Sequence, residues 1–211
     1  MFGRVVIMAL ACAAVSAMAA NSASGQDRMP PIPADKLTDA QKKAIAEFKE
    51  ARNADLSGPF VPLLRSPEVM SRARAMGDYL RFRSVLPPRL SEFVILMTAR
   101  SWTQQYEWDA HYRLALTAGL KEDTARAIGE GRRPQSMQED EELLFVFCDE
   151  LRRTHGVSDQ TYARMVAKFG EQGVIDTVGI VGYYTTLAMV MNTARTPLPA
   201  GATPALKPLP Q

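Results

Sequence analysis

The sequence predicts an all-α protein, and three observations support this class. Apolar residues recur at helical spacing, as in Leu143, Leu144, Phe147 and Leu151. Capping patterns precede several such stretches and glycines follow them. No stretch of convincing length alternates apolar and polar residues, as a half-buried strand would. Because the 211 residues are 46% hydrophobic, one domain with a single core is expected.

Residues 1–19 are expected to be a secretory signal peptide. Arg4 precedes an apolar run over 5–15, and Ala17-Met18-Ala19 fits a cleavage site with small residues. The pattern predicts a periplasmic or secreted protein. Cys12 would leave with this segment, so Cys148 would be the only thiol of the mature chain. A disulfide within one chain is thereby excluded.

The expected domain spans 37–195, between a flexible lead-in at 20–36 and an extended, mobile, proline-rich tail at 196–211. A capping box at Thr38 and Gln41 predicts a helix to about Asn53. The apolar segment 58–64 is expected to be a loop, and Ser66 to cap a helix from Pro67 to about Phe82. Further helices are expected at 88–100, at 104–118 ending at Gly119, and at 122–128, 138–154, 158–169 and 173–194.

Composition limits the class of partner. The formal net charge is +2 and no long basic run occurs, so nothing indicates nucleic-acid binding. The uncharged run from Thr177 to Met191 is shorter than a membrane span. We therefore expect a small-molecule partner and no stable membrane insertion.

Residues 89–111 contain the candidate site. Glu92 is the only charged residue from Leu90 to Ala99, in a segment typical of a buried helix, so its carboxyl group needs a partner or must be neutral. Gln104, Glu107 and His111 follow at i, i+3 and i+7, on one stripe of a second helix. Two carboxyl groups and an imidazole that face an interior suit acid–base chemistry.

Each of these residues also has a purely structural interpretation. Glu92 lies near a helix N-terminus, where the dipole tolerates a negative charge. Glu107 and His111 could form an ordinary ion pair one turn apart. Aromatic residues at helical spacing, here Tyr106 and Trp108, usually belong to the core. No metal site is expected, because a third imidazole is missing near Glu107 and His111.

Three motifs carry a family resemblance: Arg89-Leu90-Ser91-Glu92, Tyr106-Glu107-Trp108 with His111, and Ala118-Gly119-Leu120 before a short helix. With them, residues 57–197 resemble the carboxymuconolactone decarboxylase family, which shares a superfamily with alkylhydroperoxidase D. The resemblance implies an AhpD-like helical bundle that forms a homo-oligomer, as a trimer or hexamer, and it implies no cofactor.

The resemblance also points to one branch of this superfamily. Its peroxidases use a Cys-x-x-Cys pair, a histidine four residues later and a glutamate twelve residues before the first cysteine. With the histidine at His111, the cysteine positions hold Gln104 and Glu107, and the glutamate is Glu92. The decarboxylase branch also lacks the thiols. Its reaction removes carbon dioxide from γ-carboxymuconolactone and gives an enol-lactone.

The leading functional hypothesis is an exported acid–base enzyme that acts on a small carboxylated lactone or ring-cleavage acid. In this hypothesis Glu107 orients His111, which moves a proton at the carbon that loses carboxylate, and Glu92 is the second acid or base. The substrate would contact Gln104, Tyr106 and Trp108. Two alternatives are a hydroperoxide reductase that uses Cys148 with an external thiol, and a non-catalytic periplasmic binding protein.

Overall fold

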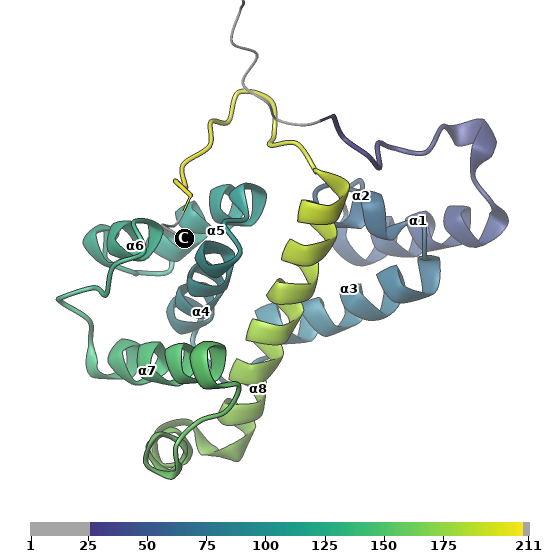
Figure 1. Ribbon diagram of the computed structural model, residues 1–211. Helices are drawn as coiled ribbons and strands as arrows, with labels where there is room; N and C mark the ends of the chain where they lie inside the picture. Colours follow the sequence, from purple (N-terminus) through teal and green to yellow (C-terminus); the bar gives the residue numbers. More distant parts are fainter. Residues whose placement is uncertain (1–25, 209–211) are drawn as a thin grey trace, which may run out of the picture.

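The computed structural model describes residues 26–208, and all regular structure within this range is helical (Figure 1). The all-α prediction is therefore confirmed. The signal peptide expected at 1–19 lies outside the described residues. A 3-10 turn at Ala34–Lys36 precedes eight helices: α1 Asp39–Arg52, α2 Phe60–Leu63, α3 Pro67–Phe82, α4 Pro88–Ser101, α5 Gln105–Thr117, α6 Glu122–Gly129, α7 Glu139–Thr154 and α8 Asp159–Ala194.

Most helix boundaries lie where the capping signals predict them. The Thr38 capping box is present, and Ser158 accepts a hydrogen bond from the Thr161 N–H. The capping role expected for Ser66 is wrong, because its side chain makes no such bond. Pro67 begins α3 without it, since proline fixes φ at a helical value and has no N–H to satisfy.

The segment 58–64 was expected to be a loop but contains α2. This helix is a single turn, too short to produce a periodic pattern in the sequence. Phe60 and Leu63 are buried, so the turn is held by its packing rather than by helix propensity.

Helix α4 lies at the centre of the bundle. Ten of its 14 residues are buried, which agrees with the prediction of a helix that is apolar nearly all round. It packs against α5, α6, α7 and α8. Figure 1 shows α8 between two groups of helices, with α1 to α3 on one side and α4 to α7 on the other.

Helix α8 changes direction at Gly170, whose φ of 70° and ψ of 173° are not helical. The expected division into two helices, 158–169 and 173–194, is therefore present as a break within α8. By length and composition α8 is apolar enough to cross a membrane, but half of its most apolar stretch is buried inside the bundle.

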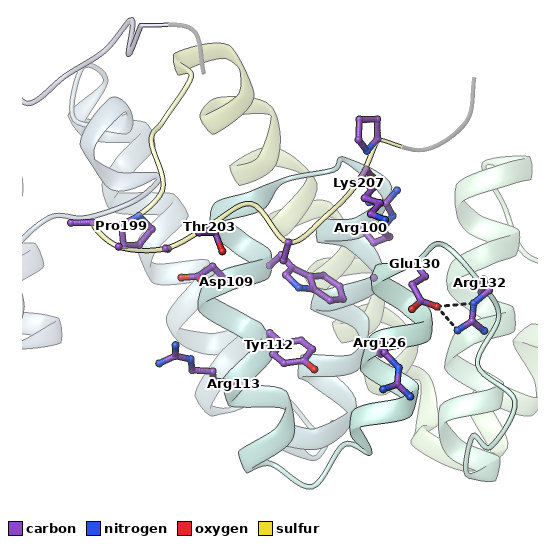
Figure 2. A pocket seen from close by; sticks show the side chains of 17 residues that line it. Arg100, Asp109, Tyr112, Arg113, Arg126, Glu130, Arg132, Pro199, Thr203 and Lys207 are labelled. Atoms are coloured by element: carbon purple, nitrogen blue, oxygen red, sulfur yellow. Dashed lines mark hydrogen bonds and ion pairs between the residues drawn. The ribbon is translucent and has the colours of Figure 1, made fainter. Parts of the chain in front are cut away.

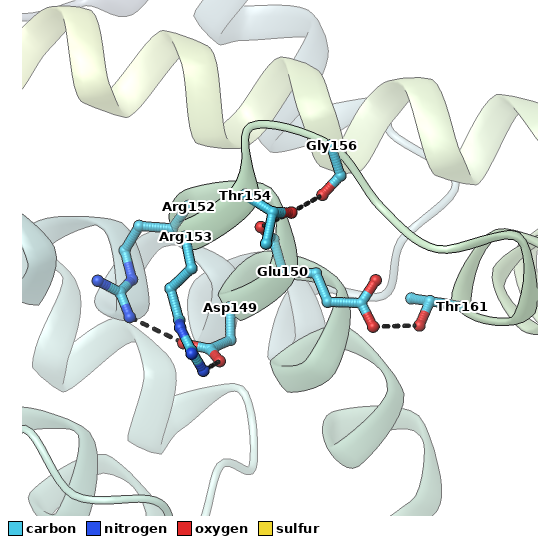
Figure 3. Close-up of polar contacts among 7 residues, drawn as sticks. All are labelled: Asp149, Glu150, Arg152, Arg153, Thr154, Gly156 and Thr161. Atoms are coloured by element: carbon cyan, nitrogen blue, oxygen red, sulfur yellow. Dashed lines mark hydrogen bonds and ion pairs between the residues drawn. The ribbon is translucent and has the colours of Figure 1, made fainter.

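The connection from α7 to α8 is held by polar contacts (Figure 3). His155 ends α7 in the left-handed region, with a φ of 60°, one residue before Gly156. The Thr154 hydroxyl donates to the Gly156 carbonyl at 3.0 Å. Glu150 accepts hydrogen bonds from the Ser158 N–H and the Thr161 hydroxyl, both at 2.8 Å. These bonds lower the pKa of Glu150.

The segments before α1 and after α8 are extended, but both are bound to the bundle. The Arg28 N–H donates to the Ala194 carbonyl at 2.8 Å. The Gln105 carboxamide accepts from the N–H groups of Ala205 and Leu206, each at 3.0 Å, and donates to the Leu206 carbonyl at 2.6 Å. Leu206 is only 4% exposed. The expectation of a free tail is therefore wrong for residues 205–206, which α5 holds.

Candidate active site

The turn between α4 and α5 positions the candidate residues. It occurs at Trp102 and Thr103, where the weak helix formers predicted a break, and Thr103 adopts a left-handed φ of 47°. Gln104 then caps α5, because its side-chain oxygen accepts from the N–H groups of Tyr106 and Glu107. Its side-chain nitrogen donates to Asn192 at 2.9 Å. The geometry does not support the substrate-binding role expected for Gln104, since both ends of its carboxamide are occupied.

The imidazole of His111 is held by Glu92 across the α4–α5 interface. The distance from His111 Nδ1 to Glu92 Oε2 is 2.7 Å, and the two residues are 7% and 8% exposed. The prediction that Glu107 orients His111 is wrong, because the partner comes from α4 and not from the preceding turn of α5. A carboxylate on Nδ1 holds the ring and leaves Nε2 for exchange with a ligand.

Glu107 is buried without a partner. It is 3% exposed, and neither of its carboxyl oxygens has a hydrogen-bond partner among the described residues. Burial raises its pKa to about 9, because desolvation disfavours the charged form. At neutral pH Glu107 is therefore a neutral acid that is able to donate a proton or a hydrogen bond.

Glu107 and His111 line one cavity of about 190 Å³, which lies where α1, α2, α3, α5 and α8 meet. Tyr106 also lines it, as expected of a substrate-binding residue, whereas Gln104 and Trp108 do not. The remaining lining residues are Phe48, Arg52, Ser57, Pro59, Phe60, Arg81, Ala110, Tyr183, Tyr184 and Leu187. Trp108 lies on another face of α5, where it packs against Tyr112 with ring centroids 5.7 Å apart.

Two tyrosines complete the wall around the imidazole. The Tyr184 ring meets His111 edge-on, with centroids 5.0 Å apart and planes at 87°, and Tyr183 meets Tyr184 in the same way. Burial raises the pKa of Tyr184 well above its usual value, although Arg81 opposes the shift. Tyr184 is therefore a neutral hydroxyl in the pH range in which Glu107 is neutral.

Two arginines give the cavity a positive side. Arg52 pairs with Asp78 at 2.8 Å and lies over the Phe60 ring at 4.6 Å from its centroid. Arg81 lines the cavity and has no ion-pair partner within 4.0 Å among the described residues. An anionic group that enters the cavity would thus meet an uncompensated guanidinium.

Sequence reasoning missed both arginines and gave the tyrosines no role in the site. Arg52, Arg81 and Tyr184 lie on three other helices, and no motif near Glu107 and His111 indicates them. The only signal was the Tyr183-Tyr184 pair itself, since no other aromatic residue occurs from Glu171 to Ala194.

Glycines make room for two of these rings. A Cβ atom on Gly77 would overlap the Tyr183 hydroxyl group, and one on Gly58 would overlap the Tyr106 ring. Gly58 also has a φ of +54°, which strains any L-residue with a side chain. Both positions thus require glycine if the cavity is to keep this wall.

Thiol and metal chemistry have no visible support at this site. Cys148 is 6% exposed and is not among the residues that line the cavity. Burial raises the pKa of its thiol to about 12, and such thiols are unreactive. Within residues 26–208, no three His, Cys, Asp or Glu side chains gather as metal ligands.

The chain is similar to known proteins in the sequence of one segment and in its fold. Residues 67–134 match the carboxymuconolactone decarboxylase family, and this segment contains Glu92, Glu107 and His111. A crystal structure described as an alkylhydroperoxidase AhpD core, an uncharacterised peroxidase-related protein from Ralstonia eutropha JMP134, superposes with a TM-score of 0.66. The match is 16% identical and covers 82% of this chain and 92% of the other, so it shows a shared fold. No curated protein matches the chain.

Proposed function

We propose that this chain is an acid–base enzyme related to the carboxymuconolactone decarboxylase family, whose model matches residues 67–134, and that it acts on a small carboxylated lactone or ring-cleavage acid. One observation carries the proposal. A neutral, unpartnered Glu107 shares a cavity with His111, whose other side is held by Glu92. Export belongs to the proposal too, since it rests on the pattern at residues 1–19.

The cavity supports a small anionic substrate. Its volume of about 190 Å³ is below the range for drug-sized ligands. Arg81 offers an unpaired guanidinium to an anionic group that the substrate keeps, while Phe48, Phe60 and Leu187 give an apolar wall for the carboxylate that leaves. A carboxylate in such surroundings is poorly solvated, which favours its loss as neutral carbon dioxide.

The proposed decarboxylation consumes one proton. The bond between the ring carbon and the carboxylate breaks, carbon dioxide leaves, and the electron pair passes into the conjugated lactone as an enolate. Glu107 donates a hydrogen bond to the developing enolate oxygen. His111, with its imidazolium stabilised by Glu92, delivers the proton from Nε2 to carbon and then recovers one from solvent.

The revised roles differ from those predicted from the sequence. Glu92 is a positioning residue that acts through His111, and Glu107 is the neutral acid in contact with substrate. Tyr106 keeps its expected place beside the substrate, with Tyr184 as a further hydroxyl-bearing ring. Gln104 and Trp108 have no contact with the cavity.

The Ralstonia protein is called peroxidase-related, which makes a thiol-dependent hydroperoxide reductase the alternative function to test. The buried Cys148 argues against it, because a thiol with a pKa of about 12 is not a thiolate at neutral pH. Hydroperoxide reduction abolished by iodoacetamide would favour this alternative over decarboxylation.

A direct test measures carbon dioxide release from a panel of carboxylated lactones and aromatic ring-cleavage acids. We expect His111→Ala to lower kcat by about 100-fold or more, the usual contribution of one acid–base group. Glu107→Ala should lower kcat by a similar factor, because it removes the hydrogen-bond donor to the enolate oxygen. Glu92→Gln should lower kcat more than it raises KM, since it acts through His111. His155→Ala and Glu122→Gln are matched controls, because both residues are exposed and outside the cavity.

Two outcomes would contradict the proposal. Equal rates for His111→Ala and the parent would remove His111 from the reaction. Absence of turnover across the panel, together with ligand binding that His111→Ala weakens, would favour the non-catalytic binding protein.

A further inference from the structure

A second hollow lies on another side of α5 (Figure 2). Trp108, Asp109, Tyr112 and Arg113 line a cleft of about 1280 Å³, whose other walls come from α6 and residues 199–208. Residues 107 and 111 face the cavity described above, and successive helical residues are rotated by about 100°. The two hollows therefore share α5 but no lining residue.

Arg100, at the end of α4, is the unusual residue of this cleft. It is only 5% exposed, and no carboxylate lies within 4.0 Å of it among the described residues. Its Nη1 donates to the Lys207 carbonyl at 2.8 Å, and its Nε is buried without a partner. Burial lowers the pKa of Arg100, as expected for a cation without an anion beside it.

A buried arginine without a counter-charge indicates a site for an anion. Burying a cation is costly unless a negative group pairs with it. The Lys207 carbonyl supplies only a dipole, and the unpartnered Nε points to a missing acceptor. A carboxylate satisfies a guanidinium through two parallel N–H···O bonds.

The other charged side chains of the cleft indicate how many negative charges a ligand should carry. Arg126 is paired with Asp123 and Arg132 with Glu130, so these two arginines are already neutralised. Arg113 and Lys207 also line the cleft but are exposed, so solvent screens their charges. Asp109 lines the cleft without an ion-pair partner among the described residues, and its charge disfavours a ligand with several negative groups. A single negative charge fits best.

The wall beside Arg100 is flat and apolar in part. Trp108 and Tyr112 are in ring contact, and Pro199, Ala202 and Ala205 of the tail line the same cleft. Such a surface accepts an aromatic or alicyclic ring next to the carboxylate.

We propose that the Arg100 cleft is a second ligand site, distinct from the His111 cavity, which binds a small organic monocarboxylate with a flat apolar body. The carboxylate pairs with Arg100 and the ring lies against Tyr112, beneath residues 199–207.

The test is titration calorimetry with benzoate at constant ionic strength. We expect one benzoate per chain, and benzyl alcohol and inorganic phosphate to bind about ten-fold more weakly or worse, since they lack the carboxylate or the ring. Arg100→Met should lower the affinity for benzoate by about ten-fold or more. Arg164→Met is the matched control, because Arg164 is an exposed arginine of α8 that does not line this cleft, and the affinity of this variant for benzoate should stay within about two-fold.

Two further measurements keep the test valid if Arg100→Met does not fold. Arg100→Lys retains the charge but not the two-pronged donor, so it should also weaken benzoate binding. In the parent protein, the Nε–H resonance of Arg100 should shift on addition of benzoate and not of benzyl alcohol.

Several results would overturn the proposal. One is an equal loss of affinity for benzoate in Arg100→Met and Arg164→Met. The others are tighter binding of phosphate than of benzoate, and no binding of benzoate at all. Binding of one benzoate per two chains with dimerisation would assign the cleft to an interface between copies.

Discussion

At the scale of single residues, the sequence indicated which polar side chains lie inside but not how they pair. Glu92, Glu107 and His111 all face the interior, as their apolar neighbours predicted. The i, i+4 spacing of Glu107 and His111 suggested a pair, yet His111 bonds to Glu92 instead. Spacing along one helix reports neighbours on that helix, whereas the contact with α4 depends on how the two helices pack.

The buried Glu107 makes stability depend on pH. Its pKa is about 9 in the folded protein against an ordinary 4.5, so the folded state holds a proton that the unfolded state releases. The free energy of unfolding should therefore fall as pH rises from about 4.5 to about 9. Glu107→Gln cannot titrate, so its stability relative to the parent should rise with pH by up to about 1.4 kcal/mol per unit.

Urea unfolding at several pH values within this window measures the effect. Glu122→Gln is the control, because Glu122 is exposed at the start of α6, and its stability relative to the parent should not change with pH. A parallel pH dependence for Glu107→Gln and the parent would show that Glu107 is charged in the folded state.

At the scale of elements, capping residues and periodicity predicted the long helices well. Thr38, Ser158 and Gly119 lie at helix ends as expected, because these signals act within a few residues of each other. Helix α2 was missed, since its single turn is stabilised by packing of Phe60 and Leu63. Local sequence thus predicts elements whose stability is local.

The contact between α3 and α8 depends on Gly77. Gly77→Ala should destabilise the protein by about 1–3 kcal/mol, because its Cβ overlaps Tyr183. The displaced Tyr183 should also disturb the cavity and weaken substrate binding. Gly182→Ala is the matched control on α8, where no atom lies within 4 Å, and it should stabilise by up to about 1 kcal/mol. Urea unfolding measures the free energy of unfolding of both variants. Equal changes in this free energy for Gly77→Ala and Gly182→Ala would contradict the close packing of Tyr183 against Gly77.

At the scale of the whole molecule, the cavity could not be predicted, because its lining comes from α1, α2, α3, α5 and α8. Arg52, Arg81 and Tyr184 approach Glu107 only through the tertiary packing of these helices. The bound tail was missed for a similar reason. Proline content predicted an extended chain correctly, but the partner that holds it, Gln105, lies about a hundred residues away.

We expect the protein to form a homo-oligomer through α3 and the limb of α8 that follows Gly170. Large apolar side chains are exposed on these helices and on the connection after α3, including Met76 at 45%, Val85 at 45% and Ile175 at 68%, and patches of this kind are typical of interfaces. Ile175→Lys should shift the sedimentation of the protein towards the monomer. Tyr162→Lys, at a 43% exposed site in the first limb of α8, is the control and should leave the oligomer intact. A parent protein that sediments as a monomer would contradict this expectation.

The Gln105 side chain bonds only to main-chain atoms of the tail, at Ala205 and Leu206. The Leu206 side chain is buried. A carboxamide that bonds to N–H and carbonyl groups does not distinguish one amino acid from another. Residues 202–205 should therefore tolerate extensive replacement, provided that position 206 keeps an aliphatic anchor, whereas the φ of 82° at Gly201 favours glycine there. That region of the molecule offers a place where new side chains can be introduced above the cleft without redesigning the helices beneath.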